Sequence, residues 1–184
     1  MLVIITGLAV GWIRKGKILA MPFVKLKLIW LLFVAYALQH ISIAWLHGTA
    51  YEVVLVVSYL SILGFCVVNW RVPGVIWNLA GTAANFLVMS VNGLRMPAYL
   101  PAARALDAAL VPALIRGQYA KSVAMSSHTH LNFLGDIFSF AIKPASLISV
   151  GDILFAIGLV ILIQHAMRSE GGPTENGVQA ETAH

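Results

Sequence analysis

The sequence contains few charged residues, few acidic residues and almost no cysteine. Charged side chains make up 10% of its 184 residues, against about 25% in an ordinary soluble domain. Hydrophobic residues make up 60%, and the mean hydropathy is +0.87. This composition excludes an ordinary soluble domain and predicts an integral membrane protein whose main partner is the lipid bilayer. The one cysteine, Cys66, excludes an internal disulfide bond and a metal site built from several cysteines.

The excess of basic residues follows the apolar runs and does not indicate nucleic acid binding. The net charge is +5 at pH 7, but the basic residues of segment 14–27, together with Arg71 and Arg168, lie beside apolar stretches. Lysine and arginine in such positions mark the cytoplasmic side of a membrane protein. We therefore expect a multi-pass protein of the bacterial inner membrane with its C-terminus in the cytoplasm. We expect no nucleic acid partner and no cofactor.

The apolar runs predict an all-α membrane domain over residues 1–168 with about five transmembrane helices, the first of them short. A helix needs about 20 residues to cross a bilayer. The predicted spans are residues 2–20, 28–46, 53–70, 74–91 and 149–167. Segment 92–148 has no clear span and is predicted to lie outside. Residues 101–119 are predicted to form an interfacial helix, with a second short span as the alternative. The polar tail, residues 169–184, is predicted to be disordered and cytoplasmic.

Two of the seven acidic residues, Asp136 and Asp152, stand at the edge of apolar sequence rather than in a polar loop. Each follows a glycine, and Asp152 lies at the start of the last predicted span. An ionisable group costs roughly 2.5–3.5 kcal/mol at the bilayer centre and less near the interface. We therefore expect hydrogen bonds, a shared proton or a partner charge to stabilise Asp152, and Asp136 is the nearest acidic candidate in the sequence.

Polar residues in the fourth predicted span repeat with helical spacing. Asn78, Thr82 and Asn85 are separated by four and three residues, so they share one face of that helix. We expect this face to look into the helix bundle, where Asn78 and Asn85 would support a site by hydrogen bonding.

The fourth predicted span also contains a spaced glycine motif, GTAANFLVMSVNG, in which Gly81 is followed by Asn85 and later by Gly93. This motif resembles the Gly-x-x-x-Asn element, and the glycine after it, of the lipoprotein signal peptidases, which are bacterial intramembrane aspartyl enzymes. Asp136 in LGDIF resembles the first catalytic aspartate of the family, and Asp152 in SVGD resembles the second. The resemblance implies a membrane-embedded peptidase whose two catalytic aspartates face the outside, acting on a membrane-embedded substrate.

The chain also departs from that pattern. Val88 and Met89 stand where the family carries an Asp-Arg pair, and Ser149 stands where it carries an asparagine. The whole chain, with NGLRMP, LGD and SVGD in this order, more closely resembles an uncharacterised bacterial family of multi-span membrane proteins. That second resemblance implies no activity.

The residues themselves allow two interpretations of the aspartates. Two carboxyl groups held close together share a proton, and such a pair can activate a water molecule and protonate a leaving group. Alternatively, Ser149-x-x-Asp152 is a capping-box pattern for the last helix, and Gly135–Asp136 is a plain turn. The second interpretation suits a non-enzymatic protein, either a small transporter or an accessory subunit that contacts a partner helix.

Two histidines precede Asp136. His128 and His130 lie on one face of an extended segment and could bind a metal together with a carboxylate. The alternatives are that both are interfacial polar residues, or that His130 hydrogen-bonds Asp136. With no third clear ligand in the sequence, we expect no metal.

Overall fold

A computed structural model describes residues 2–14, 25–119, 121–142 and 145–168. Within these residues the chain forms seven α-helices, one 3-10 turn and four short strands. The helices are α1 (Leu2–Ile13), α2 (Trp30–Trp45), α3 (Gly48–Val68), α4 (Val75–Ser90), α5 (Leu100–Leu106), α6 (Leu110–Ile115) and α7 (Val150–Arg168), with the turn η2 (Asn132–Leu134). The strands are β1 (Met96–Ala98), β2 (Ser122–Ala124), β3 (Asp136–Phe140) and β4 (Ser146–Ser149).

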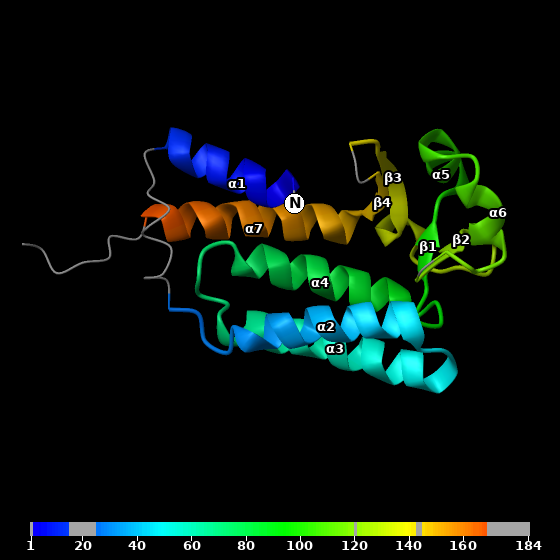
Figure 1. Ribbon diagram of the computed structural model, residues 1–184, viewed down its shortest axis with the longest axis horizontal. Helices are drawn as coiled ribbons and strands as arrows, with labels where there is room; N and C mark the ends of the chain where they lie inside the picture. The colour runs from blue at the N-terminus through cyan, green and yellow to red at the C-terminus, as the bar shows by residue number, and fades with distance from the viewer. Residues whose placement is uncertain (1, 15–24, 120, 143–144, 169–184) are drawn as a thin grey trace, which may run out of the picture.

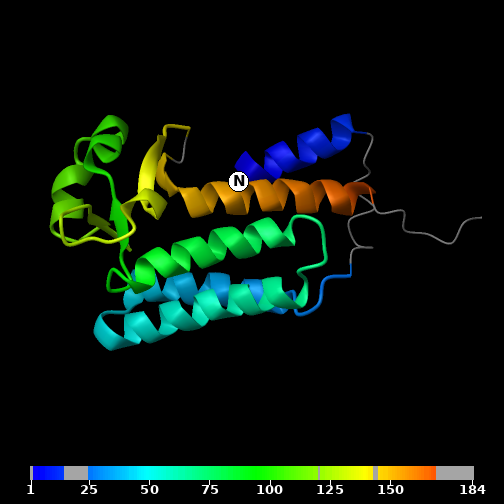
Figure 2. The same cartoon turned by 180° about the vertical axis from the view of Figure 1, so that it is seen from behind.

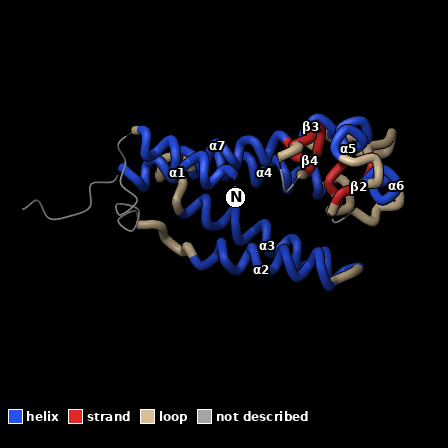
Figure 3. The backbone as a smooth tube through the Cα atoms, turned by 45° about the horizontal axis from the view of Figure 1, so that its top comes forward, coloured by secondary structure: helices blue, strands red, loops and turns tan. Residues whose placement is uncertain are grey.

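The five longer helices lie alongside one another, and the strands gather with α5 and α6 at one end of them (Figures 1 and 2). Helix α2 packs on α3, α3 on α4, α4 on α7, and α7 on α1. Figure 3 shows α2 and α3 as one layer beside α1, α4 and α7. The chain is therefore a helix bundle with a small strand unit at one end, formed by β1 to β4, α5 and α6.

Two helices, α3 with 21 residues and α7 with 19, are long and apolar enough to cross a membrane. Helices α2 and α4 are shorter apolar helices of 16 residues each. Helix α1 has 12 residues, and most of the rest of the first predicted span lies outside the described residues, as does the tail predicted to be disordered. The prediction of a mainly helical protein is thus confirmed. Two of the five predicted spans form helices long enough to cross a membrane.

Glycines let α4 and α7 approach each other closely. A Cβ atom added at Gly158 would lie 2.6 Å from the carbonyl oxygen of Gly74. One added at Gly151 would lie 2.6 Å from the carbonyl oxygen of Gly81. Small residues at such contacts are the usual means of packing helices tightly where a membrane supplies no hydrophobic drive.

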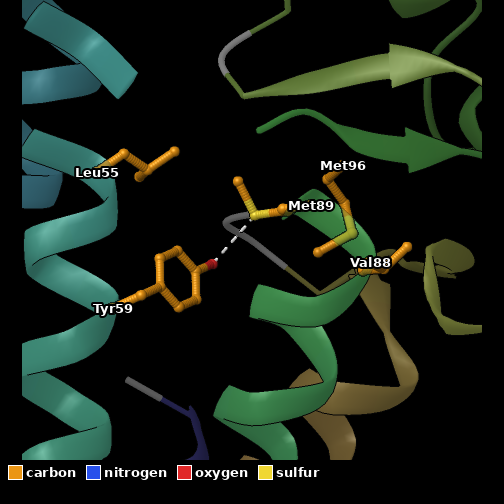
Figure 4. Close-up of a cluster of buried hydrophobic side chains, with 5 residues drawn as sticks. All are labelled: Leu55, Tyr59, Val88, Met89 and Met96. Carbon is orange, nitrogen blue, oxygen red and sulfur yellow. Dashed lines mark hydrogen bonds between the residues drawn. The ribbon is translucent and has the colours of Figure 1, made fainter. Parts of the chain in front are cut away.

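The bundle and the strand unit share a hydrophobic core, in which side chains of α3, α4 and β1 meet (Figure 4). Tyr59 donates a hydrogen bond from its hydroxyl to the sulfur of Met89, at 3.3 Å. The cluster consists of Leu55, Tyr59, Val88, Met89 and Met96. Because Met96 belongs to β1, this core fixes the strands against the ends of α3 and α4.

The strand unit corrects the all-α prediction. Its strands form one mixed sheet in the order β2-β1-β3-β4, with β1 parallel to β2 and β3, and β4 antiparallel to β3. Strands of three to five residues are too short to show a readable alternation of apolar and polar residues.

The interfacial helix predicted within residues 101–119 is replaced by two short helices. The chain is extended at Asp107, between α5 and α6, and the carboxylate of Asp107 accepts a hydrogen bond from the backbone N–H of Ala109 at 2.8 Å. Both helices fold onto the strands through Ala103, Leu114 and Leu147, which are buried together.

Candidate functional site

Asp152 lies in the first turn of α7 and closes a reciprocal cap with Ser149. The hydroxyl of Ser149 accepts a hydrogen bond from the backbone N–H of Asp152, and Oδ2 of Asp152 accepts one from the backbone N–H of Ser149, each at 3.0 Å. This is the capping box that the Ser149-x-x-Asp152 spacing favours. A carboxylate near a helix N-terminus is also favoured by the helix dipole.

Asn85 of α4 joins this cap from the neighbouring helix. Its side-chain amide donates to Oδ1 of Asp152 at 2.8 Å, and its Oδ1 accepts from the hydroxyl of Ser149 at 2.7 Å. Ser149 is fully buried, and Asn85 is buried. A Cβ atom at Gly151 would collide with Oδ1 of Asn85, so the glycine before Asp152 makes room for the asparagine. Both carboxylate oxygens of Asp152 therefore have hydrogen-bond donors.

Asp136 is the first residue of β3 and pairs directly across the sheet with Ser149 in β4. The pairing is irregular between Asp136 and Phe138, and such irregularities re-aim side chains. Asp136 is 7% exposed, and its Oδ2 accepts a hydrogen bond from the hydroxyl of Ser122 at 3.1 Å. The β3–β4 pairing thus brings Asp136 to the residue that caps Asp152.

The electrostatics of Asp136 follow from this position. Burial, and then the charge of Asp152, raise its pKa from 3.8 to about 6, while Lys121 and the hydrogen bond from Ser122 act in the opposite direction. Burial disfavours the charged form of a carboxyl group, and a like charge nearby does the same. Protonation of Asp136 is therefore within reach near neutral pH.

Lys121 is the cation of this region. Its ammonium donates to the hydroxyl of Tyr59 at 3.2 Å. Burial lowers the pKa of Lys121, but Tyr59 and then the carboxylates of Asp152 and Asp136 raise it, and the net pKa lies above its ordinary value. A charged ammonium therefore accompanies the two carboxyl groups.

Lys121, Ser122 and Tyr59 are site residues that the sequence does not reveal. Lys121 is one of five basic residues in segment 92–148, and neither its spacing nor its neighbours distinguish it from the others. Ser122 reaches Asp136 only because β2 and β3 belong to one sheet. Only a prediction that β1 pairs with β2 would have identified Lys121 and Ser122 as site residues.

One buried acceptor near the site lacks a partner among the described residues. The side-chain oxygen of Asn132 is buried without a hydrogen bond there. Asn132 belongs to η2, which packs against α4, α7 and β3, the three elements that carry Asn85, Asp152 and Asp136. A water molecule or a substrate N–H group would satisfy this oxygen.

The remaining candidates make contacts with other parts of the chain. Asn78 donates its side-chain amide to the carbonyl of Phe155, further along α7, and so serves the α4–α7 contact. His128 and His130 are exposed, and the main chain of His130 is held by both side-chain groups of Asn92 at 2.8 Å. Within the described part of the chain, no group of three or more His, Cys, Asp or Glu side chains could hold a metal ion. The hydrogen bond from His130 to Asp136 remains a prediction.

Comparison with known families places this site in context. Residues 23–164 match the model of a family of unknown function, DUF5317. The chain belongs to this family. The membership confirms the expectation of a family with no assigned activity, and the matched region contains both aspartates, Asn85, Ser149 and Lys121. It excludes α1, which lies before residue 23. No curated protein and no solved structure gives a significant match to this DUF5317 member.

Proposed function

We propose that this DUF5317 member is a membrane-embedded aspartyl hydrolase of the peptidase type, with Asp136 and Asp152 as its catalytic pair. The observation that carries the proposal is the β3–β4 pairing, which sets Asp136 opposite Ser149, the cap of Asp152. Two carboxyl groups in unlike environments are the usual arrangement for acid–base chemistry by one pair.

The two environments suggest the division of labour. Asp152 accepts a hydrogen bond on each carboxylate oxygen. In this proposal it is the general base that takes a proton from the attacking water. Asp136, with its raised pKa, is the general acid that gives its proton to the leaving amine. Hydrolysis of an amide consumes one water, and transfer of the proton from Asp152 to Asp136 restores the starting state. Lys121 stabilises the shared negative charge.

The proposed membrane topology places the pair on the external face. Basic residues gather at the end of the bundle away from the strands: Arg14 donates to Gln164, and both line one cavity with Arg168. Arg71 lies in the α3–α4 turn at the same end. By the positive-inside rule this end is cytoplasmic, so the strand unit with both aspartates lies outside. Large apolar side chains exposed on α2, such as Phe33 at 71%, suit contact with lipid.

A comparison of protein N-termini tests the activity. Cells would carry the wild type, Asp136→Asn, Asp152→Asn or the matched control Asp107→Asn, and mass spectrometry would compare N-termini in their membrane fractions. Loss of general acid–base catalysis costs about 10²–10⁴-fold in rate. We expect a set of N-termini present with the wild type and the control, and absent with both site variants at equal protein level. The same N-termini in all four strains would refute a peptidase.

A second candidate is a non-enzymatic membrane protein, either a small transporter or an accessory subunit. The observation that favours it is that the cap and Asn85 already satisfy both oxygens of Asp152. Under this alternative Asp152 only stabilises the start of α7, and Asp136 is a buried structural carboxyl. Its coupling to Asp152 would then carry no consequence for cell physiology, and the N-termini would not change.

A further inference from the structure

A cavity of about 470 Å³ lies at the same end of the bundle as the carboxyl pair but is lined by other residues. Three separate parts of the chain form its wall: the end of α2 with the link to α3 and the start of α3, the segment between α4 and β1, and the segment after α6. The link contributes Leu46 and His47, and the other two segments contribute Arg95 and Gln118. The cavity therefore exists only where the bundle meets the strand unit.

Its polar wall is organised around Arg95. The guanidinium lies over the ring of Tyr51, 5.8 Å from the ring centroid. The hydroxyl of Tyr51 in turn donates to the carbonyl of Leu94 at 3.2 Å, which fixes the ring. A planar guanidinium held against an aromatic ring is oriented before a ligand arrives, so less freedom is lost on binding.

The charge around this cavity is positive. Arg95 forms part of its wall, and Arg116 donates a hydrogen bond to the wall residue Gln118. Glu52, which follows the wall residue Tyr51 in the sequence, is the acid beside these two cations. The further polar wall residues, His47 and Gln118, offer an imidazole and an amide. An anion therefore suits the cavity better than a cation. The guanidinium fork matches phosphate oxygens in particular, since it presents paired N–H donors.

Part of the wall is apolar. Ile43 belongs to α2 and Leu46 directly follows this helix, and Ile43 is 41% exposed. A cavity with a cationic wall and an aliphatic wall matches a molecule with an anionic head and an apolar body. We propose that this cavity binds a phosphate-bearing ligand, either the headgroup of an anionic lipid or free phosphate. The proposal goes beyond the hydrolase, since binding needs neither aspartate.

Melting of the full chain in an uncharged maltoside detergent tests the proposal. Three probes would be titrated: dihexanoyl phosphatidic acid, dihexanoylglycerol as its neutral counterpart, and inorganic phosphate. We expect a saturable rise in melting temperature with dihexanoyl phosphatidic acid and none with dihexanoylglycerol. An equal rise with inorganic phosphate at the same concentrations would identify free phosphate as the ligand, and a much smaller one would identify the lipid headgroup. No saturable rise with either phosphate compound would overturn the proposal.

Variants locate the binding. Arg95→Gln should weaken the apparent affinity by about 10–100-fold, since a hydrogen bond to a charged group is lost. The matched control is Arg104→Gln, because Arg104 is exposed on α5 outside this cavity. Gln118→Glu is the second variant, because it places a negative charge on an exposed wall position whose partner Arg116 can pair equally well with a carboxylate. It should weaken binding at least tenfold, and wild-type affinity in both cavity variants would contradict the assignment.

Discussion

Asp136, at the start of β3, and Asp152, in the first turn of α7, each follow a glycine, yet the structure surrounds them differently. Asp152 is half-buried, and both of its oxygens accept hydrogen bonds. Asp136 is 7% exposed, and its carboxylate accepts a hydrogen bond from Ser122. The two glycines also differ in purpose, since Gly151 makes room for Asn85, whereas Gly135 lies against Pro97 and Met125.

The same local pattern, a glycine followed by an aspartate, therefore occurs in two different environments. The hydrogen-bond donors to the carboxylate of Asp152 are the backbone N–H of Ser149 at the start of α7 and the side-chain amide of Asn85 in α4. Asp136 is buried and lies near the charge of Asp152, and both effects raise its pKa. The two carboxyl groups therefore differ in burial and in hydrogen bonding, as the proposed division into an acid and a base requires.

The largest expected difference between the two aspartates is that Asp136 makes the unfolding free energy of the protein depend on pH. Its pKa is about 6 in the folded chain and 3.8 ordinarily, so the folded state binds a proton more tightly. The stabilisation is complete below pH 3.8 and is lost as pH rises through 6. A difference of about two units corresponds to about 3 kcal/mol. Relative to Asp136→Asn, the wild type should lose about that much unfolding free energy between pH 4 and 7.

Melting curves of the wild type and Asp136→Asn across this pH range measure the difference. Asp107→Asn is the matched control, because Asp107 is exposed and an asparagine can still accept the hydrogen bond from Ala109. Parallel pH profiles for the wild type and Asp136→Asn would show that the pKa of Asp136 is not raised.

A smaller effect separates the two asparagines of α4. Asn85→Ala removes partners from Ser149 and Asp152, and Asn78→Ala removes the partner of the Phe155 carbonyl. Loss of a buried hydrogen-bond partner costs about 1–3 kcal/mol, so both variants should melt at lower temperature. Only Asn85→Ala should also reduce the set of N-termini produced by the wild type. Equal activity in the two variants would show that Asn85 serves packing alone.

The parts of this account that rest on local sequence could be predicted, and those that rest on long-range pairing could not. The Ser149-x-x-Asp152 spacing predicts the cap of α7. The four- and three-residue spacing of Asn78, Thr82 and Asn85 predicts the buried face of α4. Apolar length indicates α3 and α7. The pairing of β1 with β2 joins Met96 to Ser122, residues far apart in the sequence, through strands of three residues. Segments this short show no periodicity that predicts a sheet, so the sequence did not identify Lys121 and Ser122 as site residues.

The central claim is that the two carboxyl groups interact, and a double-mutant cycle tests it most directly. The free energies of unfolding of the wild type, Asp136→Asn, Asp152→Asn and the double variant would be measured at pH 7. Asp152→Asn should cost about 0.5–2 kcal/mol through its weakened cap, offset by relief of the repulsion, and Asp136→Asn should keep or raise stability. Either single change relieves the repulsion fully, so the double variant gains it only once. The double variant should therefore be less stable than the sum of the single effects predicts, by more than about 0.5 kcal/mol. Additivity within that margin would show two independent carboxyl groups and would contradict the catalytic pair.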